Sequence, residues 1–243
     1  MKVIKGSGAG LFALSVISAA ALPAGAASFN VPGSANLNLA GRAPGYTCCS
    51  GDALPGQGPT LVSGLTLVAG QQLSFVVSGE VSYYGAGASG NNPDGTAYGS
   101  IPSNYGDGIT APINVNRVDA LMGLFLGPTS PTGSASPAAI DFSGVLNFSS
   151  LSPLVGQIFF IGNGKTGDTN ASDFGGTVQQ FVVPTGATRL YLGTSDGYGW
   201  YNNSGQFLVE VAGAVPEPGT YALMGLGLAL VGVSARARRR SAA

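Results

Sequence analysis

The sequence predicts an all-β protein, an antiparallel β-sandwich or jelly roll, on three observations. Between about residues 60 and 211, short runs of alternating apolar and polar residues are separated by Gly, Pro, Asn and Ser, which is the pattern of half-buried strands. This stretch of the sequence shows no sustained helical period. Glycine accounts for 40 of the 243 residues, which suits a chain with many tight turns. Seven or more such strands favour two packed antiparallel sheets.

The predicted strands follow one another at short intervals along the chain. They cover residues 61–68, 72–84, 119–127, 156–162, 177–183, 188–193 and 205–211. In the second of them Phe75 and Val77 fall on one face, and in the last one Phe207, Val209 and Val211 do. We expect these side chains in the core. The Ser-, Pro- and Gly-rich segment 127–153 is predicted to be a surface excursion between strands.

The N-terminus has the pattern of a secretory signal peptide. A basic opening, MKVIK, precedes the apolar run LFALSVISAAAL and the small residues PAGAAS. Cleavage is expected after Ala26 or Ala27, so residues 1–27 are the signal peptide and residues 28–214 the exported domain.

The C-terminal residues 215–243 combine three features in order. Pro216, Glu217 and Pro218 precede an apolar run that predicts a single hydrophobic helix over about 221–235, and an arginine cluster follows. The run is shorter than a comfortable membrane span of about 17–25 residues, but its basic end fits a membrane segment whose tail stays cytoplasmic.

This order of features resembles the PEP-CTERM sorting signal. The resemblance implies export in a Gram-negative bacterium, transient anchoring in the inner membrane and recognition by an exosortase. It further implies cleavage near the processing motif Pro216, Glu217 and Pro218, followed by release to the cell surface or an exopolysaccharide matrix. The alternative is a permanent single-span membrane anchor.

Charge and composition exclude several functions. Residues 28–214 contain four basic and ten acidic residues, hence a net charge of −6, which argues against nucleic-acid binding. The chain has no histidine, so the commonest general base and the usual zinc and copper ligands are missing. A bound metal would have to be satisfied by oxygen ligands, which means calcium or magnesium. The adjacent Cys48 and Cys49 could bond to each other, pair between molecules or stay free.

The segment GTSDGYGWYNNSGQF, residues 193–207, carries the candidate site. Asp196 offers a carboxylate, and Asn202 and Asn203 offer amide oxygens after a glycine-containing turn that lets backbone carbonyls point inward. Calcium takes six to eight such oxygens. An ordinary hairpin loop uses the same residue types, so both interpretations remain open at this point.

Two blocks of the sequence resemble calcium-dependent galactose-binding lectins of the bacterial PA-I type. They are VVPTGATRLYLGTSDGYGWYNNSGQFLVEV and, earlier in the chain, SGEVSYYGAGASGNNPDG, so the resemblance covers about residues 60–211. It implies a galactose-binding-like sandwich and a calcium ion as cofactor. The implied ligands are the side chains of Asp196, Asn202 and Asn203 and the backbone carbonyls of Tyr84 and Trp200. Two vicinal sugar hydroxyls would complete the shell of the ion.

The same resemblance implies a carbohydrate site around the ion. Its residues would be Asp196, Asn202, Asn92, Tyr198 and Trp200. Carboxylate and amide would hydrogen-bond hydroxyls, and the aromatic rings would stack on a sugar, with packing inside the hairpin or core as the alternative role of the rings. The chain departs from the lectins at Asn92 and Gly95, which replace a sugar-contacting histidine and glutamine.

These observations predict an exported, exosortase-processed surface or exopolysaccharide-matrix protein with a calcium-dependent, lectin-like carbohydrate-binding domain. The alternative is a structural matrix protein in which calcium only holds the hairpin together. We expect no enzyme and no catalytic residue, because acids are few and histidine is missing. The expected partners are an exosortase, the membrane through the C-terminal helix, and an extracellular polysaccharide or glycan.

Overall fold

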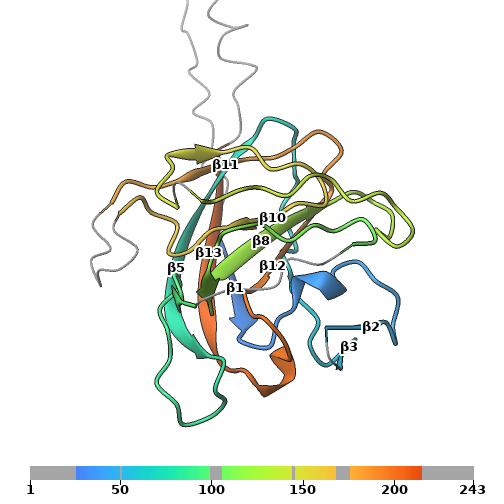
Figure 1. Ribbon diagram of the computed structural model, residues 1–243. Helices are drawn as coiled ribbons and strands as arrows, with labels where there is room; N and C mark the ends of the chain where they lie inside the picture. The colour runs from blue at the N-terminus through green and yellow to red at the C-terminus, as the bar shows by residue number, and fades with distance from the viewer. Residues whose placement is uncertain (1–25, 50, 99–105, 144–145, 168–175, 215–243) are drawn as a thin grey trace, which may run out of the picture.

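The computed structural model describes residues 26–49, 51–98, 106–143, 146–167 and 176–214 (Figure 1). Residues 1–25 of the predicted signal peptide and all of the C-terminal signal, with Pro216, Glu217 and Pro218, lie outside this range. In the described ranges, no helix has the length and apolar character needed to cross a membrane. Helical structure there is limited to two short 3-10 turns, η1 (Leu37–Leu39) and η2 (Trp200–Asn202). The predicted all-β class is therefore confirmed.

Two main sheets and two small hairpins make up the fold. The first sheet has the order β1-β13-β5-β11-β9, and the second has the order β10-β8-β12-β4. The strands of the first sheet are β1 (Ala27–Pro32), β5 (Gln72–Ser82), β9 (Ser150–Leu151), β11 (Gln180–Val182) and β13 (Ser204–Ala214). Those of the second are β4 (Thr60–Leu61), β8 (Leu121–Leu126), β10 (Ile158–Phe160) and β12 (Arg189–Thr194).

The two hairpins pair β2 (Thr47–Cys48) with β3 (Asp52–Ala53) and β6 (Thr96–Ala97) with β7 (Arg117–Val118). Pairing in the main sheets is antiparallel except between β9 and β11, which are parallel. The finer expectation of jelly-roll connectivity stays a prediction.

The main core lies between the two sheets. It is formed by every second side chain of the strands, those that point inward. On β13, Phe207 and Val209 are fully buried while Leu208 between them is exposed. On β5, Phe75 is fully buried and Val76 is exposed. These side chains join others from β8, β10, β11 and β12 in one buried cluster. The period-two pattern therefore predicted the inward faces correctly, because each strand of the first sheet has one solvent face.

Strands β8 and β10 of the second sheet are buried on both faces. All six residues of β8 are buried, and Met122, Leu124 and Leu126 pack into a second apolar cluster on its outer side. Phe142 and the partly buried Phe148, both from the segment predicted to be a surface excursion, cover this side. The segment is therefore partly a third layer over the sheet. This explains why β8 has no polar alternation.

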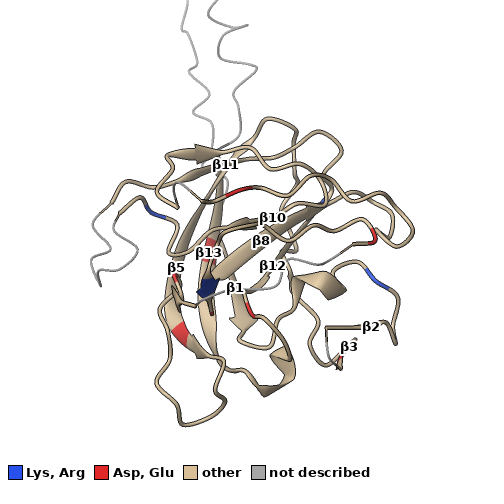
Figure 2. Ribbon diagram, in the orientation of Figure 1, with Lys and Arg blue, Asp and Glu red and all other residues tan. Residues whose placement is uncertain are grey.

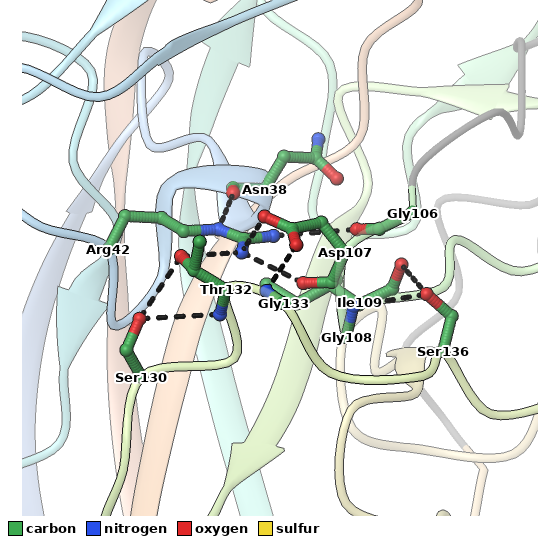
Figure 3. Close-up of polar contacts among 10 residues, drawn as sticks. All are labelled: Asn38, Arg42, Gly106, Asp107, Gly108, Ile109, Ser130, Thr132, Gly133 and Ser136. Atoms are coloured by element: carbon green, nitrogen blue, oxygen red, sulfur yellow. Dashed lines mark hydrogen bonds and ion pairs between the residues drawn. The ribbon is translucent and has the colours of Figure 1, made fainter.

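A buried arginine holds several loops to this outer layer. The guanidinium of Arg42 donates to both the backbone carbonyl and the carboxylate of Asp107, with an ion-pair distance of 2.7 Å (Figure 3). It also donates to Asn38 O and Thr132 Oγ1, at 3.3 Å and 3.1 Å. Asp107 accepts a further hydrogen bond from the backbone amide of Gly133. One side chain thus joins η1 to two loops that are far apart in sequence.

Charged residues are sparse along the described part of the chain (Figure 2). The two cysteines, whose state the sequence left open, are bonded to each other as a Cys48–Cys49 disulfide. It lies beside Asn36, whose Nδ2 is 3.6 Å from Cys48 Sγ.

Candidate functional site

The candidate site lies where the chain crosses from the second sheet to the first. β12 ends at Thr194 in one sheet and β13 begins at Ser204 in the other, so the connecting loop spans one end of the sandwich (Figure 1). Ser204 pairs with Ser82 at the end of β5, and Thr194 pairs with Leu121 at the start of β8. Four strand ends therefore meet around this loop.

Asp196 is almost fully buried in this loop, at 8% exposure. Its Oδ1 accepts hydrogen bonds from the backbone amides of Gly197 and Tyr198, at 2.5 Å and 3.4 Å. Among the described residues, nothing donates a hydrogen bond to its second oxygen, Oδ2. A buried carboxylate oxygen without a donor is costly, and a water, a proton or a cation could each satisfy it.

Asn203 lies beside Asp196, and its side chain also has a buried oxygen that lacks a donor among the described residues. Its Nδ2 donates to Gly33 O at 3.1 Å, which fixes the orientation of the amide. Its Oδ1 is buried, and no group in the described part of the chain donates to it. The Asn203 side chain is also close enough to Asp196 to lower the pKa of its carboxyl group.

The backbone at Tyr84 reaches the same place from β5. Asn202 is exposed at the end of η2, and a Cβ atom built on Gly85 would lie 3.2 Å from Asn202 O. On the other side of Tyr84, the amide of Tyr83 donates to Asp119 Oδ2 at 3.1 Å. The predicted carbonyl ligand Tyr84 therefore lies on a segment held between Asn202 and Asp119.

Trp200 has a different place from the one that a sugar-stacking role requires. The turn begins at Gly199, whose left-handed conformation (φ 72°, ψ 56°) directs the chain into η2. The ring of Trp200 is 3% exposed, and its Nε1 donates to Thr194 O at 2.9 Å. Its carbonyl accepts from the Asn203 amide at 3.1 Å. The ring thus lies inside the domain, and only the backbone of Trp200 remains available to a ligand.

Asp119 is a member of the cluster that the sequence analysis did not find. It is 0% exposed, and its amide donates to Ser195 O at 2.8 Å. The Ser195 amide in turn donates to Ala120 O at 2.9 Å. These backbone hydrogen bonds bring Asp119 next to the loop that carries Asp196, although the two acids are far apart in the sequence.

Burial controls the ionisation of these acids. It raises the pKa of Asp119 to about 6, against the hydrogen bonds from Asn91 and Tyr83, and the charge of Asp196 adds to the increase. Burial likewise raises the pKa of Asp196, while Asn203 and the Gly197 amide act in the opposite direction. The charge of one buried acid therefore makes ionisation of the other less favourable.

A small cavity of about 30 Å³ borders Asp196. Asn38 and Trp200 also line it, but most of its lining is apolar, and Asp119 and Asn203 are not part of it. Asn38 Oδ1 is a further buried oxygen to which no described residue donates.

The remaining predicted residues lie at the periphery. Tyr198 is 64% exposed and Tyr201 62% exposed. Asn92 lines a separate polar pocket of about 370 Å³ with Glu80 and Arg117, and its Oδ1 accepts from the Asp94 amide at 3.0 Å. The neighbouring residue Asn91, not Asn92, contacts the acidic cluster.

The donor set limits the possible chemistry to hard cations. The described residues contain no group of three or more His, Cys, Asp and Glu side chains that could hold a metal. The loop offers the carboxylate of Asp196, an amide oxygen and backbone carbonyls, and Asp119 offers a second carboxylate from the segment before β8. Such oxygen ligands suit calcium better than zinc or copper.

Fold and site together define an all-β domain with an all-oxygen candidate cation site at one end. A family model described as the PEP-CTERM protein-sorting motif matches residues 214–240. The match supports a PEP-CTERM protein and implies export and processing through the membrane-associated exosortase system. The comparisons with curated proteins and with solved structures gave no match, so the lectin resemblance has no support from a relative.

Proposed function

We propose that this exosortase-processed protein is a surface or exopolysaccharide-matrix protein of a Gram-negative bacterium that binds calcium and, through the ion, carbohydrate. Asp196 and Asn203 would hold the ion with their side chains. Tyr84 and Trp200 would contribute backbone carbonyls, and Asn202 its exposed amide. The ion would then bind vicinal hydroxyl groups of a glycan.

One observation carries the calcium step: the unpaired polar atoms here are all acceptors. In the described residues, five buried side-chain atoms lack a hydrogen-bond partner, and every one is an oxygen. Three of them, on Asp119, Asp196 and Asn203, belong to the candidate site. One bound water supplies donors to at most two oxygens, whereas a cation bound among the three would satisfy all of them together.

The carbohydrate step is supported by the surroundings of the cluster. Tyr84, Tyr198 and Tyr201 are all more than half exposed and come from the two segments that meet at the site. Exposed tyrosine rings combine an apolar face with a hydroxyl group and suit stacking on sugar rings. Asn92 lines the polar pocket nearby.

A specific observation favours the alternative, a purely structural calcium site. The unpaired oxygens of Asp119, Asp196 and Asn203 are buried, so an ion bound to them would have few positions open to a sugar. In that case calcium would join the two sheets at this end without any glycan.

Two measurements on the purified protein test these proposals. Calcium should raise the melting temperature relative to a chelator, in proportion to RT ln(1 + [L]/Kd). A glycan array in calcium should show binding that chelation and Asp196→Ala both abolish. The exposed, outward-facing Glu210 of β13 provides the control, and Glu210→Gln should behave as wild type.

The outcomes separate the two functions. Calcium-dependent melting without any glycan signal would support the structural site. An unchanged melting temperature would remove both proposals.

Processing is tested in cells. Replacing Pro216, Glu217 and Pro218 by alanine should leave the C-terminal segment attached and keep the protein in the membrane fraction. Wild-type chain released to the surface or matrix should have lost this segment by mass spectrometry. If the wild-type protein retains the segment, it is a permanent single-span anchor.

A further inference from the structure

Asp119 is a buried acid with an unusual backbone conformation. It has a φ of 63°, in the left-handed region that favours glycine, and it is 0% exposed. A residue other than glycine is strained in this conformation, and the surrounding structure must compensate for the strain. Such residues are found often at ligand sites. The Asp119 amide donates to the carbonyl of Ser195 at 2.8 Å, which brings Asp119 next to the segment that carries Asp196.

The two oxygens of Asp119 have different environments. Oδ2 accepts from the Tyr83 amide at 3.1 Å and from Asn91 Nδ2 at 2.7 Å. In the described ranges, Oδ1 has no hydrogen-bond partner, although it is buried. One oxygen thus orients the side chain, and the other is left inside the protein with unsatisfied lone pairs.

We propose that Asp119 Oδ1 is a direct ligand of the cation held by Asp196 and Asn203. The inference rests on the calcium site proposed above and extends it. With two carboxylates the site has a formal charge of −2, which matches a divalent ion and favours it over a monovalent one. Ligand charge is one of the factors that set calcium affinity in proteins.

The contacts of Oδ2 give this ligand a second consequence. Through Tyr83 it holds the backbone that continues to Tyr84, and through Asn91 it holds the segment that leads to Asn92. A cation on Oδ1 would therefore fix both segments from which sugar contacts are expected. Binding of the ion to Asp119 would thus also hold these two loops in place.

Asparagine at position 119 gives a clear test, because it keeps the shape of aspartate. Its single oxygen can accept from Tyr83 and Asn91, and its NH2 group takes the place of the unpaired oxygen. In a chelator, Asp119→Asn should therefore melt no lower than wild type, since it removes a buried charge. In calcium it should melt below wild type, and calorimetric titration with calcium should show affinity reduced by at least about tenfold.

Parallel variants distinguish the possible failures. Asp196→Asn should also lose calcium affinity, and Glu210→Gln should titrate as wild type. If Asp196→Asn loses calcium while Asp119→Asn binds it as wild type does, Asp119 is not a ligand and only the smaller site remains. Equal destabilisation of Asp119→Asn in calcium and in chelator would assign Asp119 a purely structural role. If the wild-type protein gives no calcium heat, both the proposed function and this inference are wrong.

Discussion

The carboxylate of Asp52 accepts a hydrogen bond from the backbone amide of Trp200 at 3.1 Å, across 148 positions of the sequence. Its other oxygen accepts from the next amide, that of Tyr201, also at 3.1 Å. The first amides of a helical turn have no partner within the turn, so this carboxylate caps η2 from outside. Asn36 Nδ2 orients Asp52 at 3.1 Å. The β2–β3 hairpin thereby fixes the turn that leads to Asn203.

Removing this cap should loosen the turn. Asp52→Ala leaves two buried amides without acceptors, and we expect a loss of about 1–3 kcal/mol in the free energy of unfolding. Because η2 leads directly to Asn203, calcium affinity should fall as well. Denaturant unfolding and a calcium titration check both effects. Asp52→Asn, which keeps one acceptor, should lose less stability, and an alanine variant as stable as wild type would contradict the capping role.

Sequence reasoning was most successful where the physics is local. The inward faces of β5 and β13 follow from period-two alternation, since one face of the first sheet meets solvent. It described the segment 127–153 only in part, because nothing local indicates that Phe142 and Phe148 of this largely exposed segment cover the outer face of another sheet. The continuous apolar run of β8 was a sign of burial on both faces.

In the candidate site, too, only the residues that are close in sequence could be predicted. Asp196 and Asn203 lie within one short loop, so their composition alone suggested oxygen ligands. Asp52 comes from β3 and Asp119 from the link between β7 and β8, and only the tertiary fold brings them to the loop. A single sequence contains no direct record of these pairings, which is why both acids were missed.

Glycine at position 79 permits a close approach between β5 and β13. Gly79 has a φ of 97°, and a Cβ atom there would lie 2.5 Å from Gln206 O. We expect Gly79→Ala to lower the free energy of unfolding by more than the roughly 1–3 kcal/mol that a left-handed non-glycine residue costs. Denaturant unfolding measures the change.

Gly70→Ala is the matched control for this prediction. Gly70 has a φ of 81°, but a Cβ atom there would have no atom within 4 Å. It should therefore show only the conformational cost. Equal losses for the two variants would mean that the strands separate easily at Gly79.

The buried guanidinium of Arg42 should not be replaceable by an ammonium group. Arg42→Lys keeps the charge but cannot reach Asp107, Thr132 and the carbonyl of Asn38 together, because only arginine has the planar fork of donors (Figure 3). We expect a loss of about 1–3 kcal/mol in the free energy of unfolding. Denaturant unfolding at low and high salt provides the measurement. The loss should persist in high salt, since the guanidinium is buried and also bonds uncharged acceptors, and a loss that disappears there would indicate a solvent-exposed ion pair.

The stability of the protein in chelator should decrease as pH rises from about 4 to about 6. Burial raises the pKa of four acids, Asp52, Asp94, Asp119 and Asp196. Between their ordinary and raised pKa values the folded state binds more protons than the unfolded chain, so stability falls as these protons leave. Asp119 alone, with its pKa raised from 3.8 to about 6, accounts for roughly 3 kcal/mol. The exposed Asp141, whose pKa is lowered by Asn114, acts in the opposite direction.

Calcium should counteract this decrease, because the ion binds the deprotonated carboxylates and its stabilising effect grows with pH. Unfolding curves between pH 4 and pH 7, with calcium and with chelator, check the prediction. Asp119→Asn is the control variant, and in chelator its profile should be flatter than that of wild type. A wild-type protein whose stability in chelator rises throughout this range would contradict the prediction. Its buried carboxylates would then be compensated by the protein alone, and no cation would be needed at this end of the sandwich.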